Sequence, residues 1–358
     1  MKLKSVSFAA AFVVAAGIAV TSASAQSVSG NEGSGETPRS LDNLPDLSQR
    51  KLVERGPKAD DISQRSFKQP TEEEMLKGFT TVIRSKDGSQ KSVEPDEEIR
   101  TSIIRSLKGE KETRAAPKTG PDPLYDEAER TVIGEDNRIR INDTTSYPFR
   151  TFGQLWSVDK NGGWSTCSAT LISSRAVLTA AHCLYDHETG GWLTDYEFYP
   201  AMNGKGLAPY GKYGWANAYI LTGYIENYQG FYGSVVPWDL AVLVLDQPAG
   251  SDLGWMGYSV YDPAYAFKAN IVGYPGDMPD STMWRASCDV DPNLVDLTNM
   301  DYECDTWPGS SGSAVYDYNP DTNQRWINGV NIASSPSVNT GLRLNWEYFA
   351  WVKQHAGN

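Results

Sequence analysis

Short apolar runs recur through the second half of the chain, and their lengths predict strands. Residues 168–172, 176–178, 240–245 and 271–272 form β-branched and aromatic runs, which Gly, Pro, Asn and Asp separate. Runs this short, with turn residues between them, are typical of an all-β barrel or sandwich. One segment differs, because residues 345–355 suit a terminal helix. Its apolar positions are Trp346, Phe349, Ala350 and Val352.

The stretch at 26–130 is more polar, with 18 Lys/Arg, 21 Asp/Glu and neither Trp nor Cys. Most of it cannot bury enough apolar area to fold, so we expect it to be mostly flexible. Residues 79–93 are the exception and predict a strand, an Asp-Gly turn and a second strand. Residues 97–109 then predict a helix with one apolar face. That face consists of Ile99, Ile103, Ile104 and Leu107. The pattern fits either a small folding module or a solvated spacer that holds one marginal helix.

The first 25 residues have the pattern of a secretory signal. Lys2 and Lys4 precede an apolar run at 8–20, and the small residues Ala-Ser-Ala follow at 23–25. This order predicts cleavage after Ala25. A membrane anchor is the alternative, but the run is shorter than the roughly 18 to 20 apolar residues that span a bilayer. We therefore expect a secreted protein, extracellular or periplasmic, with no membrane contact after cleavage, in a compartment that permits disulfides.

Composition sharpens this division of the chain. All 11 Trp of the 358 residues lie between Trp156 and Trp351. The net charge is -13, and residues 131–358 carry 12 Lys/Arg against 24 Asp/Glu. Such acidity argues against binding to nucleic acid or anionic membranes, because both need clustered cations. The predicted organisation is a signal peptide at 1–25, a prosegment at 26–130 and a folded domain at 131–358.

Three local strings carry candidate chemistry. They are Thr-Ala-Ala-His-Cys at 179–183, Trp-Asp-Leu-Ala-Val-Leu at 238–243 and Pro-Gly-Ser-Ser-Gly-Ser-Ala-Val at 308–315. A serine hydroxyl is a weak nucleophile near neutral pH, so it needs a base within hydrogen-bond reach and a carboxylate that orients the base. Backbone N–H groups must also face the oxyanion as it forms, which explains glycines beside a nucleophile.

Together these strings resemble the trypsin-like serine peptidases, in the order His, Asp, Ser, and among them the bacterial glutamyl endopeptidases of the V8 group. Residues 131–150 look like the mature amino terminus of the Bacillus enzymes, and 272–277 and 305–313 also resemble their counterparts. The resemblance covers nearly all of 131–358. It implies two six-stranded antiparallel β-barrels of the chymotrypsin type and an endopeptidase that hydrolyses peptide bonds through an acyl-enzyme.

The resemblance also assigns roles to individual residues. His182 would be the general base, Asp239 would orient it, and Ser311 would be the nucleophile. The N–H groups of Gly309 and Ser311 would form the oxyanion hole. Ser310 and Ser313 compete with Ser311, but the glycines on either side of Ser311 match the nucleophile position of the family.

The four cysteines agree with export. Cys167 and Cys183 flank the strand that leads to the histidine, as the histidine-loop disulfide does in trypsin-like enzymes, and Cys288 then pairs with Cys304 by elimination. Each disulfide would close a loop of about 15 residues, worth roughly 3 kcal/mol on the chain-entropy model. The chain has neither Cys-x-x-Cys nor His-Glu-x-x-His spacing, so we expect no zinc site, and no loop has a recognisable calcium-ligand pattern. No cofactor is expected.

Two other protein classes fit these motifs less well. An α/β-hydrolase would need Gly-x-Ser-x-Gly and the order Ser, Asp, His, whereas Ser313 replaces the second glycine here and the histidine comes first. A chymotrypsin-fold protein that only binds is the second alternative. Loss of catalysis is usually marked by a missing triad member, and all three are present here. We expect a monomer that acts on protein or peptide substrates.

The residues expected to select the substrate depart from the family pattern at one position. Glutamyl endopeptidases bind the acidic P1 side chain with a Thr before the nucleophile and a His on the following strand. Thr306 matches the first, but Asn331 stands where the family has the His. An amide carries no charge, so the preference for glutamate should be weakened, shifted or lost. Asp305 lies where trypsin keeps its Lys/Arg-selecting Asp, so basic or broad preferences remain open.

The junction Arg130-Thr131 suggests a processing site. In chymotrypsin the freed amino terminus pairs with an Asp immediately before the nucleophile, but that position is Ser310 here and the ion pair cannot form. Maturation would therefore act differently, by removing a prosegment that blocks the enzyme or helps it fold.

Overall fold

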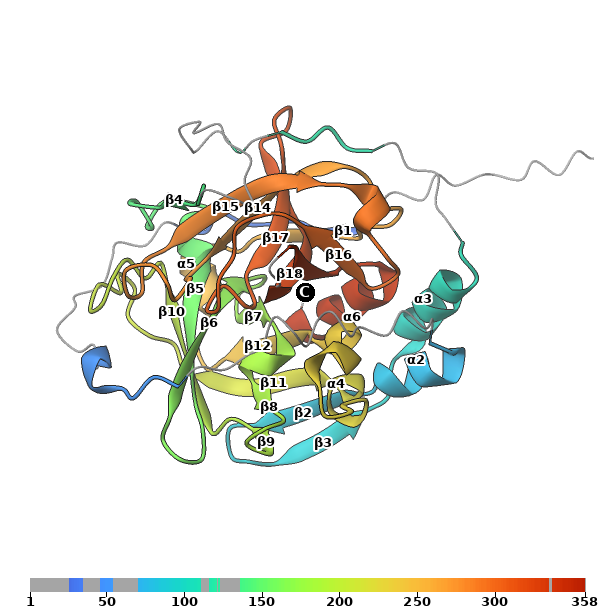
Figure 1. Ribbon diagram of the computed structural model, residues 1–358, viewed down its shortest axis with the longest axis horizontal. Helices are drawn as coiled ribbons and strands as arrows, with labels where there is room; N and C mark the ends of the chain where they lie inside the picture. Colours follow the sequence, from blue (N-terminus) through green and yellow to red (C-terminus); the bar gives the residue numbers. More distant parts are fainter. Residues whose placement is uncertain are drawn as a thin grey trace, which may run out of the picture.

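The computed structural model describes residues 26–34, 46–53, 70–110, 116–120, 122, 136–334 and 337–357. The predicted signal peptide and the predicted processing site both lie outside these residues. Two large sheets dominate the structure and form its upper and lower halves in Figure 1. Strands β5 and β14, defined below, contact each other where the two sheets meet.

The first sheet has the strand order β10-β5-β6-β7-β12-β11-β2-β3, and every neighbouring pair is antiparallel. Its last two strands come from the predicted prosegment. The other six are β5 (Phe152–Val158), β6 (Trp164–Leu171), β7 (Ala176–Thr179), β10 (Asp195–Pro200), β11 (Trp215–Leu221) and β12 (Ala241–Leu245).

The second sheet has nine strands along the path β1-β13-β18-β17-β14-β15-β4, with β19 joining β18 to β16. Its longer strands are β14 (Phe267–Gly273), β15 (Trp284–Val290), β16 (Asn299–Tyr302), β17 (Ala314–Asn319), β18 (Gln324–Ser334) and β19 (Asn339–Arg343). Its short strands are β1 (Ser27–Val28), β4 (Ile139–Arg140) and β13 (Gly257–Ser259).

The all-β prediction is confirmed. Six strands of the predicted domain form most of the first sheet, and six strands of at least four residues form most of the second. Both strand orders are open paths within the described residues, so the sheets are not closed barrels. The additional strands β1, β2 and β3 come from the predicted prosegment. Its polar composition predicted a mostly flexible segment, but these parts of it are ordered strands of the two sheets.

Within the predicted domain the helices lie outside the two sheets and are α4 (Thr222–Glu226), α5 (Ala249–Leu253) and α6 (Trp346–Ala356). Short 3-10 turns connect the strands: η2 (Phe149–Thr151), η3 (Ala181–Cys183), η4 (Tyr232–Ser234), η5 (Val236–Trp238) and η6 (Pro292–Leu294). A small separate hairpin is formed by β8 (Tyr185–Asp186) and β9 (Gly191–Trp192). The α6 helix confirms the predicted terminal helix. It begins where the Asn345 side chain accepts from the Tyr348 N–H, and it ends at Gly357, whose φ of 73° is left-handed.

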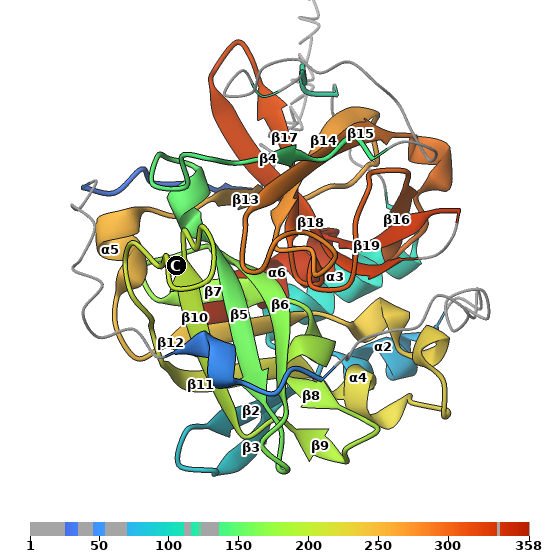
Figure 2. The ribbon, with the colours of Figure 1, turned by 60° about the vertical axis from the view of Figure 1, so that its left-hand side comes forward.

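The predicted prosegment contributes a compact group of elements, which we call the prosegment module (residues 70–110). It contains α2 (Glu72–Gly78), β2 (Thr81–Ser85), β3 (Gln90–Val93) and α3 (Glu97–Leu107). Thr71 and Glu74 form a capping box on α2, and Asp96 caps α3. The predicted strand-turn-strand and the predicted helix are both confirmed. In Figures 1 and 2 the module lies against the first sheet and α6, as the contacts between α3 and α6 also show.

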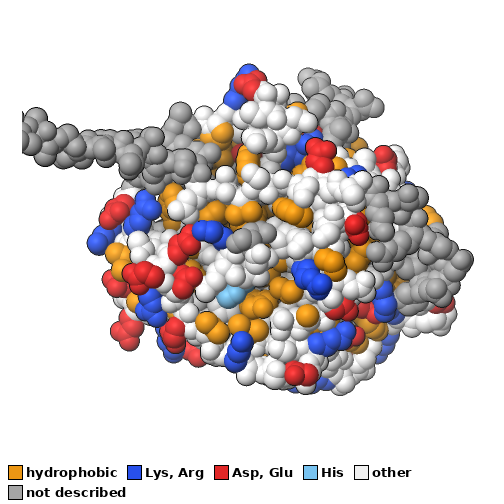
Figure 3. All heavy atoms as spheres, turned by 180° about the vertical axis from the view of Figure 1, so that it is seen from behind, with side chains coloured by type: hydrophobic (Ala, Val, Ile, Leu, Met, Phe, Trp, Pro, Cys, Tyr) orange, Lys and Arg blue, Asp and Glu red, His pale blue; other side chains and the backbone are white. Residues whose placement is uncertain are grey.

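One large hydrophobic cluster holds the first sheet, α6 and the module together. Met75, Phe79, Ile99 and Ile103 of the module belong to it and are completely buried. A second, smaller cluster lies within the second sheet. Some apolar side chains remain at the surface, and one face shows a band of them across its middle, with a histidine nearby (Figure 3). The described helices include none that is both long and apolar enough to cross a membrane.

Candidate active site

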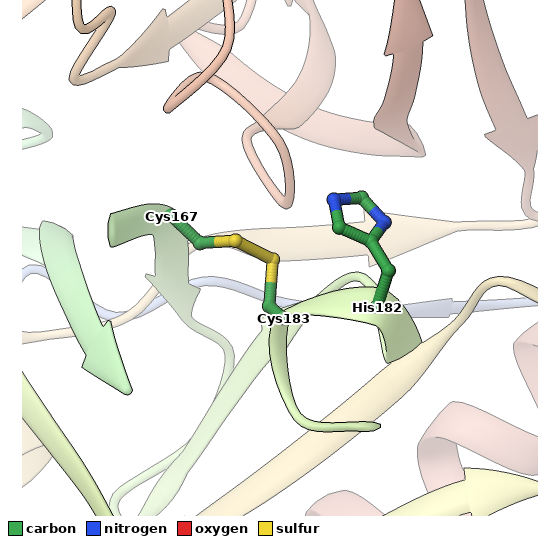
Figure 4. A group of neighbouring side chains, drawn as sticks. All are labelled: Cys167, His182 and Cys183. Atoms are coloured by element: carbon green, nitrogen blue, oxygen red, sulfur yellow. A yellow bond between two sulfur atoms is a disulfide. The ribbon is translucent and has the colours of Figure 1, made fainter. Parts of the chain in front are cut away.

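His182 follows strand β7 on the short η3 turn. Ala180 is extended before the turn, and His182 itself is only 8% exposed. Its backbone N–H donates to Asp239 Oδ1 at 2.9 Å, and its ring Nδ1 lies 2.6 Å from Asp239 Oδ2. The two contacts fix both the main chain and the ring. In Figure 4 the imidazole projects from η3 beside the disulfide of the neighbouring Cys183.

Asp239 is completely buried between η5 and β12. A third donor reaches it, because the Tyr232 hydroxyl donates to the same Oδ2 that faces the histidine. Burial, followed by the negative charge of Asp239, raises the pKa of Tyr232 well above its usual value, so the phenol keeps its proton and remains a donor. The same hydroxyl lies 3.3 Å from the Ile332 carbonyl oxygen. Three donors thus hold a buried carboxylate that would otherwise be costly to bury.

This arrangement determines the tautomer of His182. An ionised carboxylate only accepts hydrogen bonds, so Nδ1 must carry the proton that faces Asp239. The opposite nitrogen, Nε2, is buried and has no hydrogen-bond partner within the described chain. A neutral imidazole in this state has an available lone pair on Nε2, as a general base requires.

Ser311 lies on a tight loop between β16 and β17. Gly309 and Gly312 have φ values of 103° and 84°, which L side chains rarely adopt. The Ser310 N–H donates to the Trp307 carbonyl at 2.8 Å, and the Ser313 N–H donates to the Ser310 carbonyl at 3.1 Å. The two glycines therefore permit the turns that present Ser311, which is partly exposed.

Strand β6 holds this loop against the histidine segment. The Ser168 N–H donates to the Ser311 carbonyl at 2.7 Å, and the Ser168 hydroxyl donates to the Gly309 carbonyl at 2.9 Å. Cys183 Sγ lies 3.8 Å from the Ser311 carbonyl oxygen, one residue from His182. The structure therefore brings the loop with Ser311 next to the turn that carries His182.

Two backbone donors on the loop remain available. Within the described residues, neither the Gly309 N–H nor the Ser311 N–H has an acceptor, although Gly312 donates to the Asn331 carbonyl at 2.8 Å. A Cβ at Gly309 would lie 2.5 Å from the Tyr274 carbonyl oxygen, so only glycine fits there. Free, neighbouring N–H groups of this kind can stabilise an oxyanion.

Both predicted cysteine pairs are present. Cys167 is bonded to Cys183, and Cys288 to Cys304, with Cα–Cα distances of 6.1 Å and 4.9 Å. The first pair lies within 4.8 Å of a ring nitrogen of His182, which is the spacing of a metal site. Metal binding needs thiolates, however, and both sulfurs are bonded to each other (Figure 4), so this group offers a metal a single imidazole.

The two residues predicted to bind the P1 side chain have different environments. Asn331 is 2% exposed: its Oδ1 accepts from the Tyr302 hydroxyl at 2.8 Å, and its Nδ2 donates to the Ser310 carbonyl at 3.2 Å. Thr306 is partly exposed, and its hydroxyl lies 2.9 Å from that of Ser334. Asn331 therefore supports the nucleophile loop, whereas Thr306 is partly exposed and shares a hydrogen bond with Ser334.

Asp305 faces the segment that follows the predicted amino terminus. Its Oδ2 accepts from the Asn137 N–H at 3.0 Å, and burial raises its pKa. The adjacent guanidinium of Arg138 pairs with Asp136 at 2.7 Å and with Asp277 at 2.5 Å. A carboxyl that is engaged by the main chain and less acidic than usual is a weaker anchor for a Lys or Arg substrate.

Three residues of this site were not found from the sequence. Tyr232 supports the acid–base pair through Asp239. Tyr302 supports the candidate pocket through Asn331, and Ser168 supports the nucleophile loop. Tyr232 precedes Asp239 by seven residues with an irregular segment between them, and the other two lie on strands far from their partners in sequence. No local spacing marks such contacts, because the fold alone creates them.

Comparison with known proteins agrees with this geometry. The family of trypsin-like peptidase domains matches residues 167–320. The chain belongs to the trypsin-like serine peptidases, and it is a serine endopeptidase of the chymotrypsin fold related to the V8 group.

Its relatives include glutamyl endopeptidases. The Glutamyl endopeptidase of Bacillus licheniformis is 28% identical over 249 residues, which are 67% of this chain and 72% of the relative. A solved structure of a Glu endopeptidase in complex with MPD has a TM-score of 0.54 at 25% identity, and the match covers 64% of this chain and all of that one.

A third relative is named for a different chemistry. The Extracellular metalloprotease of Bacillus subtilis is 31% identical over 223 residues, 61% of this chain and 67% of that protein. In the described part of this chain, the one group of His, Cys and acidic residues spaced for a metal is the disulfide-bonded group beside His182.

Proposed function

We propose that the protein is a secreted endopeptidase in which His182, Asp239 and Ser311 form the catalytic triad. The observation that carries the proposal is the buried contact between Asp239 Oδ2 and His182 Nδ1, at 2.6 Å, while Nε2 has no partner in the part of the chain that the structure describes. A base oriented in this way can accept the Ser311 proton as the hydroxyl attacks a peptide carbonyl, and can then donate it to the leaving amine.

The oxyanion of the tetrahedral intermediate would be bound by the N–H groups of Gly309 and Ser311. Among the described residues neither has an intramolecular acceptor, and both belong to the same turn as the nucleophile. Removing one donor of this kind typically costs 10²–10³ in kcat in serine proteases. The acyl-enzyme would then be hydrolysed by water, with His182 again acting as the base.

Replacement of the nucleophile tests the triad. We expect Ser311→Ala to reduce peptide hydrolysis by about 10⁴-fold or more while the circular dichroism spectrum stays unchanged. Ser313→Ala is the matched control. Ser313 lies two residues from Ser311, and its buried hydroxyl has no hydrogen-bond partner among the described residues. Full activity of Ser311→Ala, or an equal loss in Ser313→Ala, would contradict the assignment.

Secretion and maturation belong to the same proposal. The signal-like residues 1–25, the two disulfides and an extracellular relative support export. The resemblance of residues 131–150 to a mature amino terminus supports cleavage after Arg130. Amino-terminal sequencing of the secreted protein would test both sites, and secreted protein in which no chain begins at Thr131 would contradict the second.

We further propose a P1 pocket lined by neutral groups, which accepts glutamate without strongly preferring it to glutamine. The Asn331 amide has no charge and is already bonded to Tyr302 and Ser310, and the Arg138 guanidinium is paired with two aspartates. The Thr306 and Ser334 hydroxyls can serve either a carboxylate or an amide. Charge-assisted bonds are roughly twice as strong as neutral ones, so their absence should flatten the preference.

A peptide library compared at P1 tests this pocket. The kcat/KM values for Glu and Gln should differ by less than about tenfold, which corresponds to ~1.4 kcal/mol. Introducing Asn331→His should favour Glu, because an imidazolium can pair with a carboxylate but not with an amide. A hundredfold preference of the natural chain for Glu, or for Lys, would overturn the proposal.

A further inference from the structure

The prosegment module covers a surface that a simple leader would leave open. Strand β2 pairs with β11 over five residue pairs, from Thr81 opposite Leu221 to Ser85 opposite Asn217. On its other side β11 pairs only with β12. Without the module, β11 would be an edge strand with unpaired backbone groups, which folded proteins usually protect. Strand β3 then covers β2 in turn.

Apolar contacts accompany this strand pairing. The Phe79 ring packs edge-on against Trp238, with centroids 5.7 Å apart, and lies 4.9 Å from Tyr348 of α6. Phe79 and Met75 are completely buried, as are Ile99 and Ile103 of α3. Separating the module from the rest of the chain would expose all four side chains together with their partners.

Trp238 is the centre of this contact and immediately precedes Asp239. Its indole lies between two glycines: a Cβ at Gly78 would lie 2.2 Å from Cη2, and a Cβ at Gly223 would lie 2.3 Å from Cδ2. Gly78 ends helix α2 of the module, and Gly223 belongs to α4. The module therefore forms one side of the slot that holds Trp238. Because Asp239 is the next residue, the slot also fixes the segment that carries the predicted orienting carboxylate.

Polar contacts add specificity to the interface. The Thr81 hydroxyl accepts from Trp351 Nε1 at 2.8 Å and lies 3.0 Å from His355 Nε2. The Ser106 hydroxyl donates to the buried Glu347 carboxyl at 2.5 Å, and Lys353 pairs with Glu98 at 2.9 Å. Each of these groups on α6 has its partner on the module.

None of these contacts occupies the candidate active site. Within the described residues, no hydrogen bond or ion pair joins the module to His182, to Ser311 or to the loop 305–313. The module contacts the acid–base segment through Trp238, and within the described residues Nε2 of the histidine and the two loop N–H groups have no partner.

We propose that residues 70–110 stay bound to the peptidase domain after cleavage of the leader, as a noncovalent subunit that completes the first sheet and supports Trp238. This inference rests on the proposed maturation between Arg130 and Thr131. The surface formed by β11, Trp238 and α6 would be a permanent binding site for this segment of the chain. The mature enzyme would consist of two chains, and the bound module would not inhibit it.

The test uses the full chain with a recognition sequence for an external protease in place of residues 126–130. Carrying Ser311→Ala, this chain lacks the proposed nucleophile and should not digest its own fragments, and the fragment masses check this independently of retention. After cutting, size-exclusion chromatography with mass spectrometry should find the fragment that contains 70–110 in the same peak as 131–358. A fragment that elutes separately from a folded 131–358 would overturn the proposal.

Variants at the interface sharpen this test. Phe79→Ala should weaken retention at least a hundredfold, whereas Lys91→Ala, on the exposed strand β3, should leave it unchanged. If Phe79→Ala does not fold, Thr81→Val removes only the hydroxyl between Trp351 and His355 and should weaken retention about tenfold. Equal retention in all three variants would contradict the interface.

Activity of the cut chain with Ser311 intact separates a subunit from an inhibitor. We expect the two-chain complex to hydrolyse peptide and to lose activity when the fragment is stripped off. Activity that appears only after the fragment leaves would overturn the proposal while leaving the triad untouched. Inactivity of both forms would instead contradict the proposed triad, and the retention result would still stand.

Discussion

The two sheets support the two halves of the candidate site by different means. The first sheet supplies His182 and Asp239 from segments whose side chains are buried, and the prosegment module extends its edge by two strands. The second sheet supplies Ser311 from a partly exposed loop that depends on glycine turns. Among the described residues before 131 it gains the two-residue strand β1 and Asp122, which pairs with Arg325 of β18 at 2.7 Å. The acid–base half is therefore held by burial, and the nucleophile half by backbone geometry.

This contrast predicts different sensitivities. Changes of charge or hydrogen bonding should matter most in the first sheet, where a buried carboxylate depends on three donors. Changes of backbone conformation should matter most in the loop of the second sheet, where the reactive groups are held by two left-handed glycines.

Asp239→Asn should have the largest effect among these tests. An amide at this position can donate to Nδ1, which favours the tautomer that leaves Nε2 protonated and unable to act as a base. We expect kcat to fall by about 10³–10⁴-fold with little change in KM. Asp195→Asn, which changes the acceptor of the Trp215 indole N–H elsewhere in the sheet, is the control. A loss of kcat below tenfold in Asp239→Asn would contradict the assignment of Asp239 as the residue that orients His182.

Gly309→Ala tests the second half in the same way. The new Cβ would meet the Tyr274 carbonyl oxygen and force the loop away from φ 103°, which displaces the two free N–H groups. We expect kcat to fall about 10²–10³-fold, the cost of one lost oxyanion donor. Gly162→Ala is a matched control, because that glycine also has a positive φ, of 79°, but its Cβ would meet nothing within 4 Å. Similar kinetics in both variants would contradict the account.

Tyr232→Phe should have a smaller effect within the first sheet. It removes one of three donors to Asp239 without changing the packing of the ring against His182, whose centroid lies 6.0 Å away. We expect kcat to fall about three- to tenfold with KM unchanged, as for loss of one hydrogen bond that acts through another residue. Tyr196→Phe loses a hydroxyl that donates to the Leu184 carbonyl and serves as the control. Equal kcat values for Tyr232→Phe and the natural enzyme would remove Tyr232 from the site.

Protonation of His355 should have the smallest effect of these tests, and it acts on the free energy of unfolding. Burial lowers its pKa from 6.5 to about 4, partly opposed by Asp96, while Thr81, Trp351 and Tyr219 pack around the ring. The folded state therefore holds the ring neutral, and its stabilising contribution is complete above pH 6.5 and is lost as the pH falls towards 4. Between pH 7 and pH 5 we expect a loss of about 1–2 kcal/mol.

Thermal unfolding of the uncut chain at several pH values measures this effect. Glu347, whose pKa is raised to about 7 by burial, acts in the opposite direction, since its contribution is lost as the pH rises from 4.5 to 7. The comparison must therefore be made with His355→Gln, in which the Glu347 contribution remains. The variant should lose less stability than the natural chain between pH 7 and pH 5, and parallel curves would contradict the prediction.

Much of this organisation could be predicted from the sequence. The strings around His182, Asp239 and Ser311 are local, and the structure brings their segments together; both disulfides and the terminal helix were also predicted correctly. The module was predicted as a strand-turn-strand and a helix, because Asp87-Gly88 and the spacing of Ile99 and Ile103 are local signals.

The remaining features depend on contacts between distant segments. The pairing of β2 with β11 joins residues more than a hundred positions apart, and the slot for Trp238 needs two glycines from separate helices. The composition of 26–130 is polar overall and therefore favoured flexibility. A composition taken over the whole stretch hides the few apolar residues that the module buries. In the same way, the burial of Asn331 between Tyr302 and Ser310 could not be seen from its position alone.

The most direct test of the central claim is to locate the residue that reacts with a fluorophosphonate. The mature protein should be labelled with one equivalent, and peptide mass spectrometry should place the adduct on Ser311. Prior conversion of Asp239 to Asn should slow the labelling by the same factor as peptide hydrolysis. An adduct on another serine, or no labelling of protein that hydrolyses peptides, would contradict the account.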